Sequence, residues 1–310
     1  MSVAFVFPGQ GVQYPGMLHD LLDHPAVDRT LDEVSDALLA DVRTLDSQEA
    51  LRSDVSVQVA LFSAGVGTAR AILEQGVEPA AVAGLSVGAF AAAVVAGVLP
   101  LRDGVELVRL RAQEMERLFR SGYGMSAIVG LTESQVTEMV QAETSEQSPV
   151  FVGNVNAPRQ IVIAGESAAM ERVMAAARRH GASKAVRLHV SVLSHCSLLQ
   201  PVADVLGKRI TGMCLKSPQA TYVGNVDARA LRTKERIADD LVNNIAHGVR
   251  WHDATTVLKE LGCRLFLEMP PGHALTELTR QNLPAVSSMP VEARTLSRLL
   301  RFARGEQANT

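Results

Sequence analysis

The sequence predicts an α/β fold, in which a large domain with a mostly parallel sheet carries a small inserted domain. Two patterns predict this fold. In the first hundred residues short apolar runs alternate with helical segments, as is typical of parallel sheets, and two more candidate strands follow after residue 192. Between residues 125 and 191 the expected order is strand, helix, strand, strand, helix, strand, the βαββαβ order of ferredoxin-like domains.

The first part of the large domain contains two expected strands, each followed by a sharp turn. Residues 3–7 form an apolar run that stops at Pro8-Gly9-Gln10-Gly11, so a buried strand is expected to enter a glycine turn. Helical periodicity covers residues 55–73. Residues 80–84 predict a second buried strand, and a helix of small residues is expected over 87–96.

The inserted domain supplies the remaining regular pattern. Its strands are expected at 125–129, 150–156, 160–164 and 183–188, and its helices at 133–142 and 168–180. Two further strands of the large domain are expected at 222–226 and 264–268. The predicted boundaries are 1–124 and 192–310 for the large domain and 125–191 for the small one.

Composition excludes several classes of function. With 47% hydrophobic and 20% charged residues, the 310-residue chain is expected to be an ordinary globular protein. A net charge of -3 without a Lys/Arg block argues against nucleic acid as a partner. The longest apolar run, residues 89–99, has roughly half the length that a membrane span requires, so no membrane partner is expected.

Cysteine usage points to a reducing compartment. Cys196, Cys214 and Cys263 are odd in number and form no CxxC pair, which argues against a disulfide framework or a zinc knuckle. The N-terminus shows no charged leader before its apolar stretch. A cytoplasmic protein without a metal or other cofactor is therefore expected.

The sequence Gly84-Leu85-Ser86-Val87-Gly88 matches a nucleophile elbow. In this motif small flanking residues let the chain turn tightly enough to raise a serine hydroxyl above the sheet, at the start of a helix. The required strand and helix are both predicted here, as in an α/β-hydrolase-like domain. The alternative is a glycine-rich helix start without chemistry, but the context favours Ser86 as a nucleophile.

A serine nucleophile needs a base, and the chain has eight histidines. His195 follows the expected return from the small domain, where a linker can place its side chain over the cleft. His19, His24 and His180 lie in polar helical stretches typical of a surface, whereas His247, His252 and His273 stay open as alternatives.

Arg111 lies on a predicted helix among apolar neighbours. A semi-buried arginine needs an anionic partner. Two interpretations stay open: an internal ion pair with a glutamate, or a fork-shaped clamp on the carboxylate of a substrate.

Taken together, these residues resemble the family of malonyl-CoA:acyl carrier protein transacylases over nearly the whole chain. The matching pieces are FPGQG at 7–11, GLSVG at 84–88, LR at 110–111 with Met115, NAP at 156–158, VIAG at 162–165, SH at 194–195, NVD at 225–227 and PG at 271–272. An ordered set of this kind rarely arises by chance.

The resemblance implies a ping-pong reaction. In it Ser86 attacks the thioester, His195 accepts and returns the proton, and the backbone N–H groups of Gln10 and Val87 stabilise the tetrahedral oxyanion. The substrate would be malonyl-CoA and the acceptor the thiol of an acyl carrier protein.

The resemblance also implies roles for two further residues. Arg111 would pair with the free carboxylate of malonate. The family orients its histidine with a main-chain carbonyl, near the position that Asn244 occupies here, so that serine and histidine form a dyad.

Two departures from the family pattern indicate a subfamily. Leu85 replaces the usual histidine before the nucleophile, and residues 244–251 read NIAHGVRW in place of a glutamine-containing segment. Together with EMPPGH at 268–273, they look like the epsilon subunit of malonate decarboxylase, which loads a dedicated small carrier protein. Other malonate decarboxylase subunits would then be partners.

Three alternatives are weighed against this interpretation. The same chemistry could serve fatty-acid synthesis, which composition does not distinguish. The chain order argues against a lipase-type serine hydrolase, because lipase-like triads place an acid between serine and histidine within a different sheet topology. The presence of Ser86, His195 and Arg111 argues against a non-catalytic docking subunit, which would need none of them.

A basic face could serve for docking of the carrier. Arg294, Arg298 and Arg301 have the spacing of one face of a C-terminal helix, although a solvated helix face is the commoner explanation.

Overall fold

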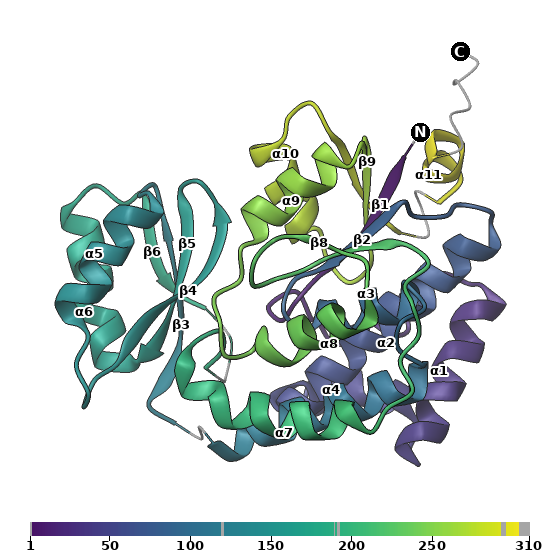
Figure 1. Cartoon of the computed structure of the whole chain (residues 1–310), viewed down its shortest axis with the longest axis horizontal. Coiled ribbons are helices and arrows are strands. Elements are labelled where there is room, and N and C mark those ends of the chain that lie inside the picture. Colours follow the sequence, from purple (N-terminus) through teal and green to yellow (C-terminus); the bar gives the residue numbers. More distant parts are fainter. Residues whose placement is uncertain (1, 119–120, 189, 191–192, 293–295, 304–310) are drawn as a thin grey trace.

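A computed structural model describes residues 2–118, 121–188, 190, 193–292 and 296–303. It contains two sheets, which lie side by side in Figure 1, the smaller one at the left and the larger one at the right. We call them the small sheet, made of β3 to β6, and the large sheet, made of the other six strands.

The large sheet has the strand order β10-β9-β1-β2-β7-β8, and only the pairing of β7 with β8 is antiparallel. This confirms the predicted mostly parallel sheet. Its strands are β1 (Val3–Phe7), β2 (Ala81–Gly84), β7 (Thr221–Val223), β8 (Ala230–Leu231), β9 (Leu265–Glu268) and β10 (Ser287–Pro290). The expected strands at 3–7, 80–84, 222–226 and 264–268 correspond to β1, β2, β7 and β9.

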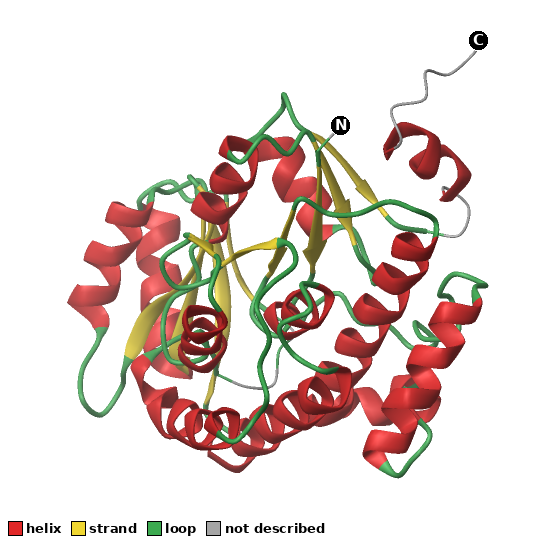
Figure 2. Cartoon of the chain, turned by 45° about the vertical axis from the view of Figure 1, so that its right-hand side comes forward, coloured by secondary structure: helices red, strands yellow, loops and turns green. Residues whose placement is uncertain are grey.

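Both faces of the large sheet are buried, and alternate residues of each strand point to opposite sides. Phe5 and Phe7 belong to one apolar core, and Ala4 and Val6 belong to another. Helices α9 and α10 cover the second core, and the remaining large helices cover the first. Figure 2 shows the helices in red around the yellow strands.

The helices of the large part surround this sheet. They are α1 (Pro25–Leu38), α2 (Asp54–Glu74), α3 (Gly88–Val95), α4 (Leu101–Leu118), α7 (Gln200–Thr211), α8 (Lys234–Asn243), α9 (Trp251–Glu260), α10 (Ala274–Asn282) and α11 (Leu296–Ala303), with short 3-10 helices η1 (Val42–Asp46), η2 (Ala50–Arg52) and η3 (Ser197–Leu199). Helix α2 is long and apolar enough to cross a membrane, but 89% of its apolar window is buried inside the protein. It is therefore a core helix of the fold.

The small sheet is antiparallel throughout, in the order β4-β5-β3-β6. Its elements are β3 (Tyr123–Val129), α5 (Glu133–Glu143), β4 (Val150–Ala157), β5 (Gln160–Glu166), α6 (Ser167–Arg179) and β6 (Lys184–Arg187). This confirms the ferredoxin-like βαββαβ order. Helices α5 and α6 pack on one face, and Met125, Val162 and Ala164 on the other face join the first core of the large part.

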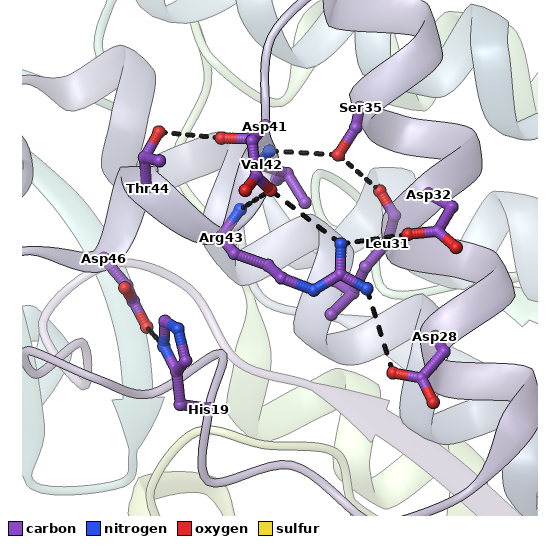
Figure 3. Close-up of polar contacts among 10 residues, drawn as sticks. All are labelled: His19, Asp28, Leu31, Asp32, Ser35, Asp41, Val42, Arg43, Thr44 and Asp46. Carbon is purple, nitrogen blue, oxygen red and sulfur yellow. Dashed lines mark hydrogen bonds and ion pairs between the residues drawn. The ribbon is translucent and has the colours of Figure 1, made fainter.

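The segment after β1 is anchored by contacts with η1. Asp46 accepts a hydrogen bond from the backbone N–H of Leu18 at 2.7 Å, and its side chain also contacts His19 at 3.1 Å. Figure 3 shows this contact beside the ion pairs of Arg43 with aspartates of α1 and of the loop that follows it. These contacts fix the chain that follows the glycine turn at Gln10.

Candidate active site

The candidate site lies at the carboxyl edge of the large sheet. Gln10 follows β1, Ser86 follows β2 and Asn225 follows β7. Because β1, β2 and β7 are parallel neighbours, their carboxyl ends meet at one edge of the sheet, where α/β proteins commonly bind ligands. Three loops that are distant in sequence therefore converge.

Ser86 occupies a strained turn between β2 and α3. Its φ of 56° lies in the left-handed region, which residues with a Cβ rarely adopt. Both flanking glycines are required by close packing, because a Cβ on Gly84 would overlap the backbone of Gly88, and a Cβ on Gly88 would overlap the carbonyl of Phe7. The local geometry is that of the predicted nucleophile elbow.

His195 is placed against the serine. Its Nε2 lies 2.8 Å from Ser86 Oγ, and its Nδ1 lies 2.6 Å from the backbone carbonyl oxygen of Asn244. This arrangement fixes a neutral tautomer in which Nδ1–H donates to Asn244 and Nε2 can accept the serine proton. Burial, and next the nearby Arg111 cation, lower the pKa of His195 to about 4, so the imidazole is neutral at pH 7.

The other candidate histidines lie elsewhere. His19, His180, His247 and His273 are exposed, and His24 and His252 are half-buried. Among the seven histidines that the structure describes, His195 is the one hydrogen-bonded to Ser86.

Arg111 is fully buried beside the serine. Its Nη2 donates to Ser86 Oγ at 3.0 Å and its Nη1 donates to Gln58 Oε1 at 2.6 Å, whereas its Nε has no partner in the described part of the chain. No carboxylate of the described residues lies within 4.0 Å of this guanidinium, so the internal ion pair with a glutamate is not seen there. Burial lowers the pKa of Arg111 to about 9, opposed by the more distant Asp54, and the side chain stays cationic at pH 7.

Two backbone donors flank Ser86. Within the described residues, the N–H groups of Gln10 and Val87 make no hydrogen bond to the protein. The side chain of Gln10 is held by Asp54 at 2.7 Å and by Gln58 at 3.2 Å, which orients the loop after β1. Free N–H groups on either side of a nucleophile are what stabilisation of an oxyanion requires.

The cavity over Ser86 holds about 100 Å³, below the roughly 300–1,000 Å³ of pockets that enclose drug-sized ligands. It can take a short acyl group. Both sheets contribute to it, since Met125, Asn154, Asn156 and Val162 come from the small sheet. The Oδ1 atoms of Asn154 and Asn156 are buried without a hydrogen-bond partner among the residues that the structure describes.

Several of these residues were not predicted as part of a site. Asn156 lies within the matching NAP segment, but Asn154 gives no separate signal. Gln58 is fully buried and is the one side-chain amide of the apolar helix α2, and that is the signal that could have found it.

Comparison with known proteins identifies the class. Residues 4–301 match the model of the acyl transferase domain family, so the chain belongs to that family and is an acyltransferase. Its α/β architecture and its nucleophile elbow agree with this class.

The particular activity follows from the relatives. The chain is 38% identical to the malonyl CoA-acyl carrier protein transacylase of Escherichia coli over 284 residues, which are 90% of this chain and 92% of that protein. The structure of the malonyl CoA-acyl carrier protein transacylase from Coxiella burnetii matches with a TM-score of 0.92 and 34% identity, over 99% of this chain and 98% of that one. The enzyme is thus a malonyl-CoA:acyl carrier protein transacylase by homology, as the motifs indicate, and none of the relatives named here is a malonate decarboxylase subunit.

Proposed function

We propose that this transacylase works by a ping-pong reaction through a malonyl ester on Ser86. The observation that supports it most is the position of Ser86 Oγ, 2.8 Å from His195 Nε2 and 3.0 Å from Arg111 Nη2. One atom thus faces both a neutral base and a cation. A nucleophile within hydrogen-bond reach of its base is the arrangement that covalent acyl transfer requires.

In the first half-reaction, His195 Nε2 takes the hydroxyl proton as Ser86 Oγ bonds to the thioester carbon. The carbonyl oxygen becomes an oxyanion, which the N–H groups of Gln10 and Val87 stabilise. The carbon–sulfur bond then breaks, and the proton on His195 passes to the departing thiolate of CoA. The second half-reaction reverses these steps with the thiol of the carrier protein as the nucleophile.

Asn244 orients the base through its backbone carbonyl. The Nδ1–H of His195 donates to this oxygen at 2.6 Å, and the backbone N–H of His195 donates to Ile245 at 2.8 Å. A carbonyl carries no net charge, so it holds the tautomer without raising the pKa of the histidine as strongly as a carboxylate would.

Arg111 recognises the malonyl carboxylate. It is a buried cation with an unpartnered Nε and without an acidic partner within 4.0 Å among the described residues. A carboxylate that enters the cavity would supply that partner, and the planar guanidinium can bind it with two parallel hydrogen bonds.

The covalent intermediate is directly testable. After incubation with malonyl-CoA, peptide mass analysis should find a malonyl ester on Ser86, and Ser86→Ala should abolish transfer. His195→Ala should lower the rate by several orders of magnitude, because nucleophile and base act as a unit. A label on another residue, or near-normal turnover of His195→Ala, would overturn the assignment.

An acyl carrier protein is the proposed acceptor. A similar protein, 36% identical with a TM-score of 0.92 over 98% of this chain and 100% of that one, forms a complex described as a type II PKS acyl-carrier protein with its malonyl-transacylase. The relatives support the general transacylase role, as in fatty-acid synthesis.

A second candidate role is that of the malonate decarboxylase epsilon subunit. It is motivated by Leu85, which lines the cavity beside Ser86, and by the NIAHGVRW segment at 244–251. Labelled malonyl-CoA offered together with both kinds of carrier distinguishes the roles, because the carrier that becomes labelled faster is the acceptor. A cytoplasmic location stays a prediction.

A further inference from the structure

We infer that Asn225 is a positioning residue for the nucleophile, which holds the Ser86 amide and so fixes the direction of the Ser86 hydroxyl. This inference rests on the proposed role of Ser86. Asn225 lies on the loop after β7 and is 3% exposed. Its Oδ1 accepts a hydrogen bond from the backbone N–H of Ser86 at 2.9 Å, across 139 residues of sequence.

The elbow needs such a tether because its conformation is unfavourable. Ser86 has a φ of 56°, and a non-glycine residue in this region is strained by about 1–3 kcal/mol unless its surroundings hold it. The backbone N–H of Ser86 precedes α3 and donates to the side chain of Asn225 instead of to a helix carbonyl. The next N–H along the chain, that of Val87, is the proposed oxyanion donor, so rotation of the 85–86 peptide would misplace both the hydroxyl and this donor.

Asn225 is itself rigidly held. Its backbone N–H donates to Asp240 Oδ1 at 2.8 Å, and its carbonyl accepts from the N–H of Arg250 at 2.9 Å. The hydroxyl of Tyr222 donates to the other oxygen of the same carboxylate, Asp240 Oδ2, at 2.8 Å. The contacts from Ser86 through Asn225 thus end on Asp240, a buried carboxylate of α8.

These contacts favour an amide at position 225. Its oxygen accepts from the N–H of Ser86 at 2.9 Å and brings no charge into the buried network. An apolar side chain has no acceptor for Ser86. An aspartate would place a second carboxylate near the buried Asp240, where like charges repel.

The test compares two variants of the same network. Asn225→Ala removes the acceptor for Ser86, whereas Tyr222→Phe removes a hydrogen bond of the network but leaves the contact between Asn225 and Ser86. Because a misplacement of about 1 Å can lower a rate by about 10²-fold, Asn225→Ala should slow acylation of Ser86 by about 10- to 100-fold with KM changed by less than about threefold. Tyr222→Phe should lower the melting temperature but keep acylation within about threefold of wild type.

Two measurements are made on each full-length protein. One is the rate of malonyl-Ser86 formation from malonyl-CoA by quenched flow and intact mass. The other is the rate at which phenylmethylsulfonyl fluoride labels Ser86, which needs no malonyl carboxylate. Asn225→Ala should be slow in both. If Asn225→Ala does not fold, Asn225→Ser, whose hydroxyl is too short to reach the Ser86 N–H, carries the same expectation.

The inference is overturned if Asn225→Ala reacts at the wild-type rate, or if Tyr222→Phe loses as much rate as Asn225→Ala, which would make the network merely structural. Failure of the proposed function looks different. In that case wild-type enzyme would form no malonyl ester on Ser86, while the sulfonyl fluoride would still report whether Asn225 positions the hydroxyl.

Discussion

Replacement of Arg111 by alanine should change acyl specificity more than any other single substitution in the site. Malonyl and acetyl groups differ by one carboxylate, and a carboxylate buried beside Ser86 is unfavourable unless a cation meets it. Arg111 is fully buried, and its guanidinium lies 3.0 Å from the reacting oxygen. Removing one partner of such a buried pair costs about 2–5 kcal/mol, or roughly 30-fold to several thousandfold in kcat/KM for malonyl-CoA.

Arg111→Lys should recover only part of this loss. The guanidinium contacts Gln58 through Nη1 and Ser86 through Nη2, with Nε still available. A lysine has one nitrogen and cannot keep Gln58 satisfied while it binds both carboxylate oxygens. For acetyl-CoA the change in kcat/KM caused by Arg111→Ala should have the opposite sign or be absent, because the methyl group of the acetyl would enter a site that no longer contains an unpaired cation. Acetyl transfer should therefore hold steady or rise in Arg111→Ala.

The assay is the ratio of kcat/KM for malonyl-CoA to that for acetyl-CoA in wild type and in both variants. Arg102→Ala is the matched control, since Arg102 lies on the same helix α4 but is exposed, and its ratio should equal that of wild type. An unchanged ratio in Arg111→Ala would refute the reasoning. Arg111 would then be a structural residue, and the carboxylate would be recognised elsewhere.

Three further predictions concern pH and salt. With the pKa of His195 lowered to about 4, acylation by acetyl-CoA should stay level as the pH falls from about 7 to 5, and an acid limb near the ordinary value of 6.5 would contradict the proposed environment of the base. Burial raises the pKa of Glu268 from 4.5 to about 7, so the contribution of this side chain to stability is full below pH 4.5 and is lost as the pH rises through 7. Over this range the free energy of unfolding of the wild type should fall by up to about 3 kcal/mol relative to that of Glu268→Gln. Parallel stability curves for the two proteins would refute this prediction. Transfer to an acidic carrier should weaken with salt more than loading from malonyl-CoA does, and equal salt dependence of the two half-reactions would count against electrostatic docking. Arg301 is exposed on α11, whereas Arg294 and the side chain of Arg298 lie outside the described residues, so the proposed basic face stays a prediction.

The parts of the fold with a strong local pattern could be predicted from the sequence. Strands β1 and β2 are continuous apolar runs, and β9 is apolar up to its last residue, Glu268, because both faces of the large sheet are buried. Their positions agree within a residue or two. Strand β10 was missed because it reads Ser-Ser-Met-Pro at an edge of the sheet, and β8 was missed because it has two residues. Neither carries an apolar run that could be recognised.

Some residues of the site could likewise be predicted from a local pattern, and others could not. Ser86 could be found because the elbow demands glycines at fixed spacing. His195 could not be separated from His247, His252 and His273 by position alone, since contact across 109 residues is set by the fold. Asn244 acts through its backbone, so its side chain carries no signal.

The cation Arg111 also influences the neutral base His195, which no motif reveals. Arg111 is the second cause, after burial, of the lowered pKa of His195. A base with a pKa near 4 is weak, so the free enzyme contains a poorly basic histidine beside an unpaired cation. A malonyl carboxylate bound to Arg111 would neutralise that cation, and the pKa of His195 should then rise toward its ordinary value. We therefore expect the same carboxylate that selects the substrate to strengthen the base that activates Ser86, whereas acetyl-CoA, which has no carboxylate, leaves the base weak.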